Sequence, residues 1–87
     1  MYVILVYDVE QKRVAKVCKY LRCYMNWIQN SVFEGELTEG KLKEIKFGLK
    51  KIIQESKDSV LIYSFADQKQ VAREIMGIEK NPVDTIL

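Results

Sequence analysis

The chain has 87 residues, of which 48% are hydrophobic and 30% charged, and its net charge is +2. These values are ordinary for a soluble globular protein, and the length suffices for a single domain, residues 1–87, with one modest core. Histidine is absent, which excludes histidine bases and Cys/His zinc sites and leaves carboxylates, the ligands of hard cations such as Mg²⁺ or Mn²⁺.

The sequence shows neither a membrane span nor a secretion signal. No apolar run approaches the length needed to cross a bilayer, and the N-terminus lacks a basic leader with a cleavage site. We therefore expect a cytoplasmic protein that does not associate with membranes. Cys18 and Cys23 are too few for a disulfide framework, so we expect both to be reduced.

Residues 1–8 (MYVILVYD) contain an unbroken apolar run from Tyr2 to Tyr7. A run this short and this apolar predicts a strand buried on both faces, at the centre of a sheet. Asp8 ends the run and places a carboxylate where the strand meets solvent. Its position is typical of a residue that begins a turn or caps the next helix and also of a functional residue, so both interpretations stay open.

Residues 11–25 have the pattern of an amphipathic helix. Apolar side chains recur at helical spacing and form one stripe: Val14, Val17, Cys18, Leu21 and Met25. All charged residues of this segment are basic, and Lys12, Lys16 and Lys19 share one face. A merely solvated face would be expected to carry both signs, so this pattern indicates nucleic acid as a partner.

Residues 27–37 (WIQNSVFEGEL) are rich in strand-forming residues around a polar centre. They predict either two short strands around a bend or one strand with a bulge. Glu34, Glu36 and Glu39 make the end of this segment acidic. They could hold a metal, but because they are spread over a strand end and a helix start, we expect them to be solvated.

A second amphipathic helix is predicted from Glu39 to about Glu55. Thr38 has the position of an N-cap, and Leu37 and Leu42 have the spacing of a hydrophobic staple. Its outward face is again mostly basic and includes Lys43, Lys46 and Lys50. The basic surface therefore extends over both predicted helices.

Residues 59–65 (SVLIYSF) predict another buried strand, and residues 71–78 predict a last, more exposed strand before a short apolar tail at 83–87. The order β-α-β-β-α-β with an extra C-terminal strand predicts an α+β, ferredoxin-like fold. In it an antiparallel sheet carries both helices on one face. The other face would expose apolar side chains, so we expect a homodimer in which a second copy covers it.

Several motifs resemble the CRISPR-associated protein two family. They are the strand end YDV, the basic helix start KRVAKV, the segment IQNSVFEGEL and, after a capped helix, the strand DSVLIYSF. The similarity extends from residue 1 to about residue 65 with matching element order, and GIEKNP near the end fits some members. Its most specific part is a first-strand YD combined with Q-x-SVFEG at this spacing.

The resemblance implies a small metal-dependent nuclease that takes part in spacer acquisition for CRISPR antiviral defence. It also implies a homodimer with Asp8 near the two-fold axis, where this aspartate binds Mg²⁺ or Mn²⁺ and supports phosphodiester cleavage. Tyr7, Arg13, Ser31 and Phe33 match other family positions linked to the catalytic site. The alternative for Tyr7 and Phe33 is core packing, and for Ser31 it is a hydrogen bond at the bend.

Two features depart from the family pattern. Trp27 stands where many members carry a basic residue, and the loop between Asp8 and the first helix looks shorter than usual. Both concern the surface that contacts substrate more than the metal site. Because one carboxylate holds a hard divalent ion poorly, we expect Asp8 from two copies, with waters and a phosphate oxygen, to complete the ligand set. Arg13 would neutralise a phosphate oxygen.

Two functions stay open at this point. The first is a Mg²⁺-dependent endonuclease that acts on RNA or DNA and needs Asp8. The second is a non-catalytic dimeric adaptor that bridges the CRISPR-associated integrase and binds duplex DNA through Lys12, Arg13, Lys16, Lys19, Lys43, Lys46 and Lys50. A regulatory domain that binds a small molecule is a weaker third hypothesis, because the sequence has no Gly-rich ligand loop.

Overall fold

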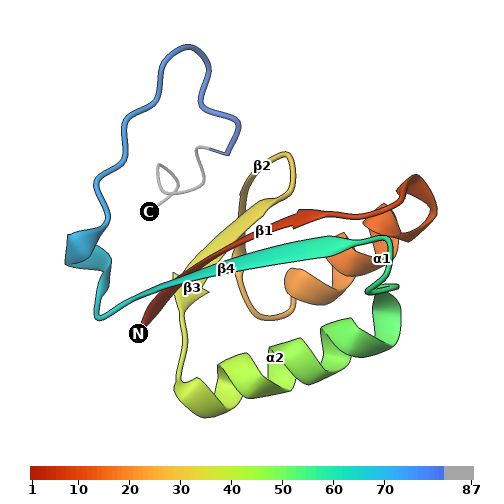
Figure 1. Ribbon diagram of the computed structural model, residues 1–87. Coiled ribbons are helices and arrows are strands. Elements are labelled where there is room, and N and C mark those ends of the chain that lie inside the picture. The colour runs from red at the N-terminus through yellow and green to blue at the C-terminus, as the bar shows by residue number, and fades with distance from the viewer. Residues whose placement is uncertain (82–87) are drawn as a thin grey trace.

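A computed structural model describes residues 1–81 and contains one sheet with two helices packed on it (Figure 1). In chain order its elements are β1 (Tyr2–Asp8), α1 (Gln11–Leu21), β2 (Asn26–Gln29), β3 (Val32–Glu36), α2 (Glu39–Ile52), β4 (Ser59–Phe65) and the 3₁₀ helix η1 (Gln68–Gln70). The predicted tail at 83–87 lies outside the described residues. No helix within residues 1–81 is long and apolar enough to cross a membrane.

The strand order is β2-β3-β1-β4, and every neighbouring pair is antiparallel. Both helices lie on the same side of the sheet (Figure 1). This arrangement confirms the predicted ferredoxin-like order of elements. It places β1 between two other strands, as its apolar sequence indicates, and leaves one face of the sheet without a helix.

The hydrophobic core lies between the sheet and the two helices. Side chains alternate between the faces of a strand, so Val3, Leu5 and Tyr7 of β1 point into the core and are at most 3% exposed. The helices add the buried members of their apolar stripes, Val17, Leu21, Leu42, Ile45 and Leu49. On the helix-free face Ile4 and Val6 are only half-buried, so in the single chain β1 is fully buried on one face rather than on both.

The segment between the helices combines both predicted alternatives. β2 and β3 are two strands joined by a turn, and their pairing shifts register between Trp27 and Gln29. Asn30 in the turn has a φ of 44°, a left-handed conformation that Asn adopts more readily than most residues.

The helix ends differ slightly from those predicted. Thr38 caps α2 as expected, because its hydroxyl oxygen accepts a hydrogen bond of 3.0 Å from a backbone N–H of the first turn. The helix α1 ends at Leu21 rather than Met25, and α2 ends at Ile52 rather than Glu55. Met25 is nevertheless buried, because the turn after α1 leads it back under the sheet.

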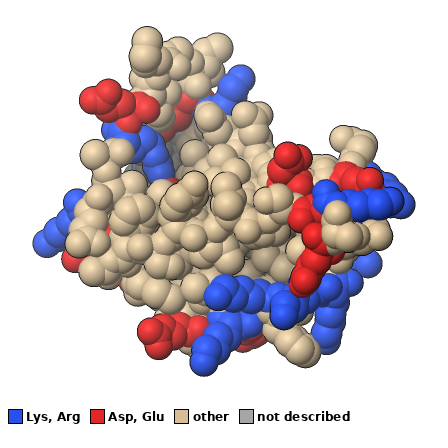
Figure 2. Space-filling model, viewed as in Figure 1, with Lys and Arg blue, Asp and Glu red and all other residues tan. Residues whose placement is uncertain are grey.

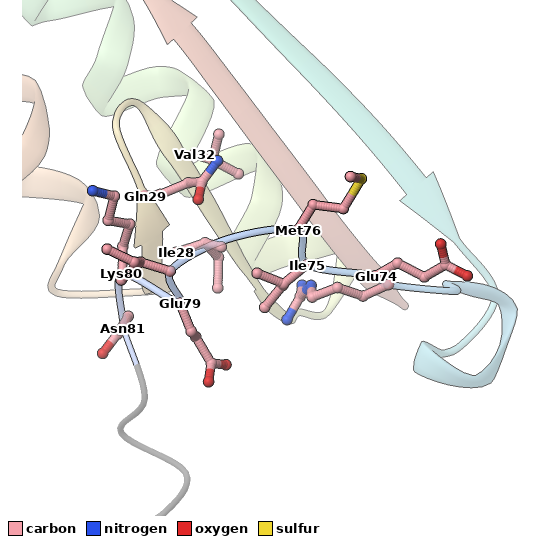
Figure 3. Close-up of a pocket in the computed structure, with 11 residues that line it drawn as sticks. Ile28, Gln29, Val32, Glu74, Ile75, Met76, Glu79, Lys80 and Asn81 are labelled. Carbon is pink, nitrogen blue, oxygen red and sulfur yellow. The ribbon is translucent and has the colours of Figure 1, made fainter.

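The predicted strand at residues 71–78 is wrong, since within the described chain no strand follows β4. An alternating sequence becomes a strand only where a neighbouring strand accepts its backbone hydrogen bonds, and this segment contacts the sheet through side chains instead. Arg73 forms an ion pair with Glu34, and the Asn81 amide donates to the Trp27 carbonyl. Between this segment and the strands β2 and β3 lies a hollow of about 240 Å³ (Figure 3), which none of the predicted site residues lines.

Glu34 also differs from the expectation that it is solvated. It is 5% exposed because it lies on the helix-free face beneath Arg73 and next to Tyr2. Burial and the neighbouring Glu34 carboxylate raise the pKa of Tyr2 to about 12. Glu36 and Glu39 are exposed, as expected. The ion pair of Glu34 with Arg73 therefore attaches the C-terminal segment to β3.

Candidate functional site

Asp8 is the last residue of β1, and its cross-strand partner is Ser59 at the start of β4. The alternation of side chains along β1 puts Asp8 on the helix-free side of the sheet, together with Ile4 and Val6. Its side chain is exposed, and within residues 1–81 no ion pair engages it. The structure thus presents a free carboxylate at the edge of an apolar face.

Arg13, in the first turn of α1, forms a buried ion pair with Asp58. Its Nε lies 2.6 Å from Asp58 Oδ2 and its Nη2 lies 2.9 Å from Oδ1, a two-pronged arrangement that fits a planar guanidinium. Nη2 also donates to Glu10 at 2.9 Å. The guanidinium is therefore bonded to Asp58 and Glu10 rather than to Asp8.

Asp58 is a functional candidate that the sequence reasoning missed. It lies in the connection between α2 and β4, and its side chain is 0% exposed. Arg13 holds the pKa of this carboxyl well below its usual range, and Asp58 in turn raises the pKa of the Arg13 guanidinium. No local sequence signal identifies this pair, because its members are separated by 45 positions and meet only when β4 pairs with β1.

Tyr7 and Phe33 lie on the opposite side of the sheet from Asp8. Their rings stack with centroids 6.2 Å apart, and the residues are 3% and 0% exposed. Burial raises the pKa of the Tyr7 phenol, and the adjacent Cys18 adds to the effect. This geometry corresponds to the core-packing alternative stated for both residues.

Ser31 lies at the bend between β2 and β3, beside the end of β1. Its carbonyl oxygen accepts a hydrogen bond of 3.1 Å from the Tyr7 amide. The bend is thereby attached to the strand one residue before Asp8. The structure thus brings Ser31 next to Tyr7, whereas the Arg13 guanidinium is directed to Asp58.

The predicted nucleic-acid contacts divide into two groups. Arg13 is 13% exposed in its buried ion pair. The lysines are all exposed, and among the described residues none of them forms an ion pair: Lys12, Lys16, Lys19, Lys43, Lys46 and Lys50. Figure 2 shows many of the basic side chains along the lower and right edges of the molecule, over the helices, and further ones at the left edge and at the top, around a largely uncharged central surface.

Comparison with known proteins agrees with this architecture. Residues 1–73 match the model of the family described as "CRISPR associated protein Cas2". The CRISPR-associated endoribonuclease Cas2 of Pyrococcus furiosus is 54% identical over 87 residues, which cover 100% of both chains. The protein of that name from Methanocaldococcus jannaschii is 53% identical over 100% of this chain and 76% of its own length.

A crystal structure of Cas2 has a TM-score of 0.86 and 49% identity to this chain, over 95% of this chain and 93% of the other. The chain belongs to the Cas2 family. This membership confirms the family resemblance that the YD and SVFEG motifs indicated.

The two departures from the Cas2 pattern have a structural account. The Trp27 indole donates to the Asn30 carbonyl at 2.9 Å, and the Arg22 guanidinium lies 5.7 Å from the centre of its ring. A cation therefore lies beside position 27 although its side chain is uncharged. The loop after Asp8 is short because only Val9 and Glu10 precede α1.

The donors of one Cas2 chain fit a hard cation only in part. Within residues 1–81 no three His, Cys, Asp or Glu side chains come together to hold a metal, so one chain does not by itself supply a full set of protein ligands. A carboxylate that is exposed and unpaired is a suitable ligand for Mg²⁺ or Mn²⁺, which need about six oxygen ligands. Further ligands would have to come from a second copy, from water or from substrate.

Proposed function

We propose that this chain is a metal-dependent endonuclease of CRISPR antiviral defence, which hydrolyses RNA and takes part in spacer acquisition in the cytoplasm. The observation that carries the proposal is the free, exposed carboxylate of Asp8 at the end of the buried strand β1. Relatives of about the same length from Pyrococcus furiosus and Methanosarcina acetivorans are named endoribonucleases, which supports RNA as the substrate. DNA has the same phosphodiester linkage and is the second substrate to test.

We further propose that the active form is a homodimer. On the helix-free face Leu61 and Tyr63 of β4 are 52% and 51% exposed, while the printed contacts of the C-terminal segment reach Trp27 of β2 and Glu34 of β3. A second copy placed on this face would bury these side chains. Because Asp8 lies at the edge of the same face, a two-fold arrangement would allow two copies of Asp8 to approach each other.

In this proposal, Asp8 of both copies holds Mg²⁺ or Mn²⁺, and the exposed lysines hold the phosphate backbone of the substrate. A bound divalent ion would polarise the scissile phosphate and acidify a water molecule, the task that a histidine base performs in other nucleases. Because the chain contains no histidine, it has no side chain of its own with an ordinary pKa near neutrality for this step.

A second function is favoured by the lysines of α1 and α2. The six predicted contacts among them, Lys12, Lys16, Lys19, Lys43, Lys46 and Lys50, are exposed and form no ion pair within the described part of the chain, as expected for residues that contact phosphates without reading sequence. A dimer would present two such surfaces and could bridge the CRISPR-associated integrase on duplex DNA. In that role Asp8 would not be required.

One experiment separates the two functions: wild type and Asp8→Asn are compared in Mn²⁺-dependent RNA cleavage and in integrase-supported spacer insertion. We expect Asp8→Asn to fold normally and to lose cleavage, because the amide keeps the shape of the side chain but not its charge. Undiminished cleavage by the variant would contradict the nuclease proposal. Wild-type spacer insertion by a cleavage-dead variant would assign insertion to the adaptor function.

A further inference from the structure

Asp58 joins three parts of the chain around the end of β1. Besides the two bonds from Arg13, its carboxylate accepts hydrogen bonds from the backbone N–H of Glu10 at 3.0 Å and of Gln54 at 2.8 Å. Glu10 follows Asp8 by two positions, and Ser59, which follows Asp58, is the cross-strand partner of Asp8. One buried carboxylate therefore fixes the backbone that leaves Asp8 and the strand that lies beside it.

We propose that the Asp58–Arg13 pair positions Asp8 for metal binding. The inference rests on the proposed function, in which Asp8 is the metal ligand. In this role neither member of the pair touches metal or substrate. Both act through the backbone of residues 8–10 and through the pairing of β4 with β1, and so they set the direction in which the Asp8 carboxylate points.

The geometry distinguishes this role from direct phosphate binding by Arg13. Three polar contacts, two to Asp58 and one to Glu10, already engage Nε and Nη2 of the guanidinium. A phosphate bound in two-pronged fashion by Nε and Nη2 would have to displace a buried carboxylate that also accepts two backbone N–H groups. Breaking such a pair leaves a charge buried without compensation, which is strongly unfavourable.

The two roles predict different results when Asp58 is removed. If Arg13 bound phosphate, the loss of Asp58 would release the guanidinium, and affinity for RNA would be kept or would rise. If Arg13 acts on Asp8 through Asp58, the removal of either partner has the same effect. Metal affinity then falls in both variants, and the KM for RNA does not change.

The test measures Mn²⁺ binding by titration calorimetry, without RNA, for wild type, Asp58→Asn, Arg13→Gln and the double variant. Removal of groups that orient a metal ligand typically weakens affinity about 10–100-fold, and we expect a loss in this range for each single variant. The double variant should be no weaker than either single one, because the pair acts as a unit. In cleavage assays kcat should fall while the KM for RNA stays constant.

Leu42→Ala is the matched control for lost stability. It removes a buried side chain near the start of α2, at the opposite end of this helix from Gln54 and Asp58, and Leu→Ala changes in a core are destabilising. It should keep wild-type Mn²⁺ affinity. If Asp58→Asn does not fold, Arg13→Lys replaces it in the test, because this variant keeps the positive charge but loses the two-pronged geometry. We expect it to have an intermediate affinity.

Three outcomes would overturn the positioning role. They are wild-type Mn²⁺ affinity in a folded Asp58→Asn or Arg13→Lys, additive losses in the double variant, and a raised KM for RNA in Arg13→Gln that Asp58→Asn does not share. If wild type and Asp8→Asn bind Mn²⁺ equally, or neither binds it, the proposed function fails and the positioning role fails with it. The Asp8→Asn measurement therefore distinguishes the two failures.

Discussion

Two ion pairs between a buried carboxylate and an arginine hold different regions of this protein, and they differ in what surrounds the arginine. In Asp58–Arg13 the side chains are 0% and 13% exposed, and the partners belong to the helix α1 and the connection before β4. In Glu34–Arg73 they are 7% and 42% exposed, and Arg73 belongs to a segment without regular secondary structure.

The two pairs differ in how much else depends on the buried carboxylate. Both carboxylates need a partner, because an uncompensated buried charge is costly. Only Asp58, however, also accepts two backbone N–H groups, which would be left unsatisfied without it. The first pair joins α1, the loop before it and the connection before β4, whereas the second attaches the C-terminal segment to the sheet.

The largest effect is expected for Asp58→Ala. The change leaves the Arg13 guanidinium buried without its charge partner and removes the acceptor of two backbone N–H groups. We therefore expect the Tm to fall by on the order of 15 °C or more. Circular dichroism at a fixed protein concentration measures it.

Asp67→Ala is the matched control for that change. Asp67 is also an aspartate at an element boundary, where it caps η1 through the Lys69 N–H at 2.8 Å, but it is exposed. Its Tm should fall by at most about 8 °C, as is usual for a lost cap at the surface. Equal Tm losses in the two variants would show that the enclosure of Asp58 contributes nothing.

Acid titration tests the same pair through its charge. Because Arg13 lowers the pKa of Asp58 in the folded state, the unfolded chain binds a proton first as the pH falls below the usual value of about 4. The stabilisation is complete above that value and is lost on acidification. The Tm difference between wild type and Asp58→Asn should therefore shrink from about pH 6 to about pH 3. A constant difference over this range would contradict the charge-based account.

The end of β1 illustrates how much the sequence could predict. The apolar run from Tyr2 to Tyr7 determines a central strand, and Asp8 follows from where that run stops, so strand and exposed carboxylate were both predictable. The Arg13–Asp58 contact was not, because helical spacing shows which face Arg13 occupies but not what packs against it. It arises only from the pairing of two strands far apart in the sequence.

The C-terminal segment illustrates the opposite limit. Residues 71–78 alternate like a strand, but alternation does not supply a strand edge to pair with. Glu34 looked solvated for a similar reason, since nothing near it in the sequence indicates that Arg73 covers it. Local patterns could predict the elements up to β4 and the N-cap at Thr38, and they failed where a charge meets a partner from another element.

A smaller effect is expected for Arg73→Ala. It exposes Glu34 to solvent once the C-terminal segment loses its ion pair, and hydration then replaces part of the lost interaction. We expect a Tm lower by about 5 °C, well below the loss in Asp58→Ala. Lys80→Ala, an exposed position in the same segment, should leave the Tm within about 2 °C of wild type. A Tm loss in Arg73→Ala as large as that in Asp58→Ala would show that the two pairs contribute equally to stability.

The smallest effect concerns Tyr2, which lies beside the second pair. Burial and the Glu34 carboxylate raise its pKa from 10.0 to about 12, so between these values the unfolded chain releases a proton that the folded protein retains. This contribution to stability is present below pH 10 and is lost as the pH rises toward 12. Removal of the phenol in Tyr2→Phe should therefore reduce the decrease in Tm between pH 9 and about pH 10.5 by about 3 °C.

Tyr63→Phe provides the control, because Tyr63 lies on the same helix-free face but is 51% exposed. Its thermal stability should follow that of wild type across the alkaline range. The double variant Tyr2→Phe with Arg73→Ala should show the same reduced decrease as Tyr2→Phe, since the phenol that titrates is already gone. A full alkaline decrease in Tyr2→Phe would mean that the segment around Arg73 does not enclose Tyr2, and the second pair would then be looser than the structure indicates.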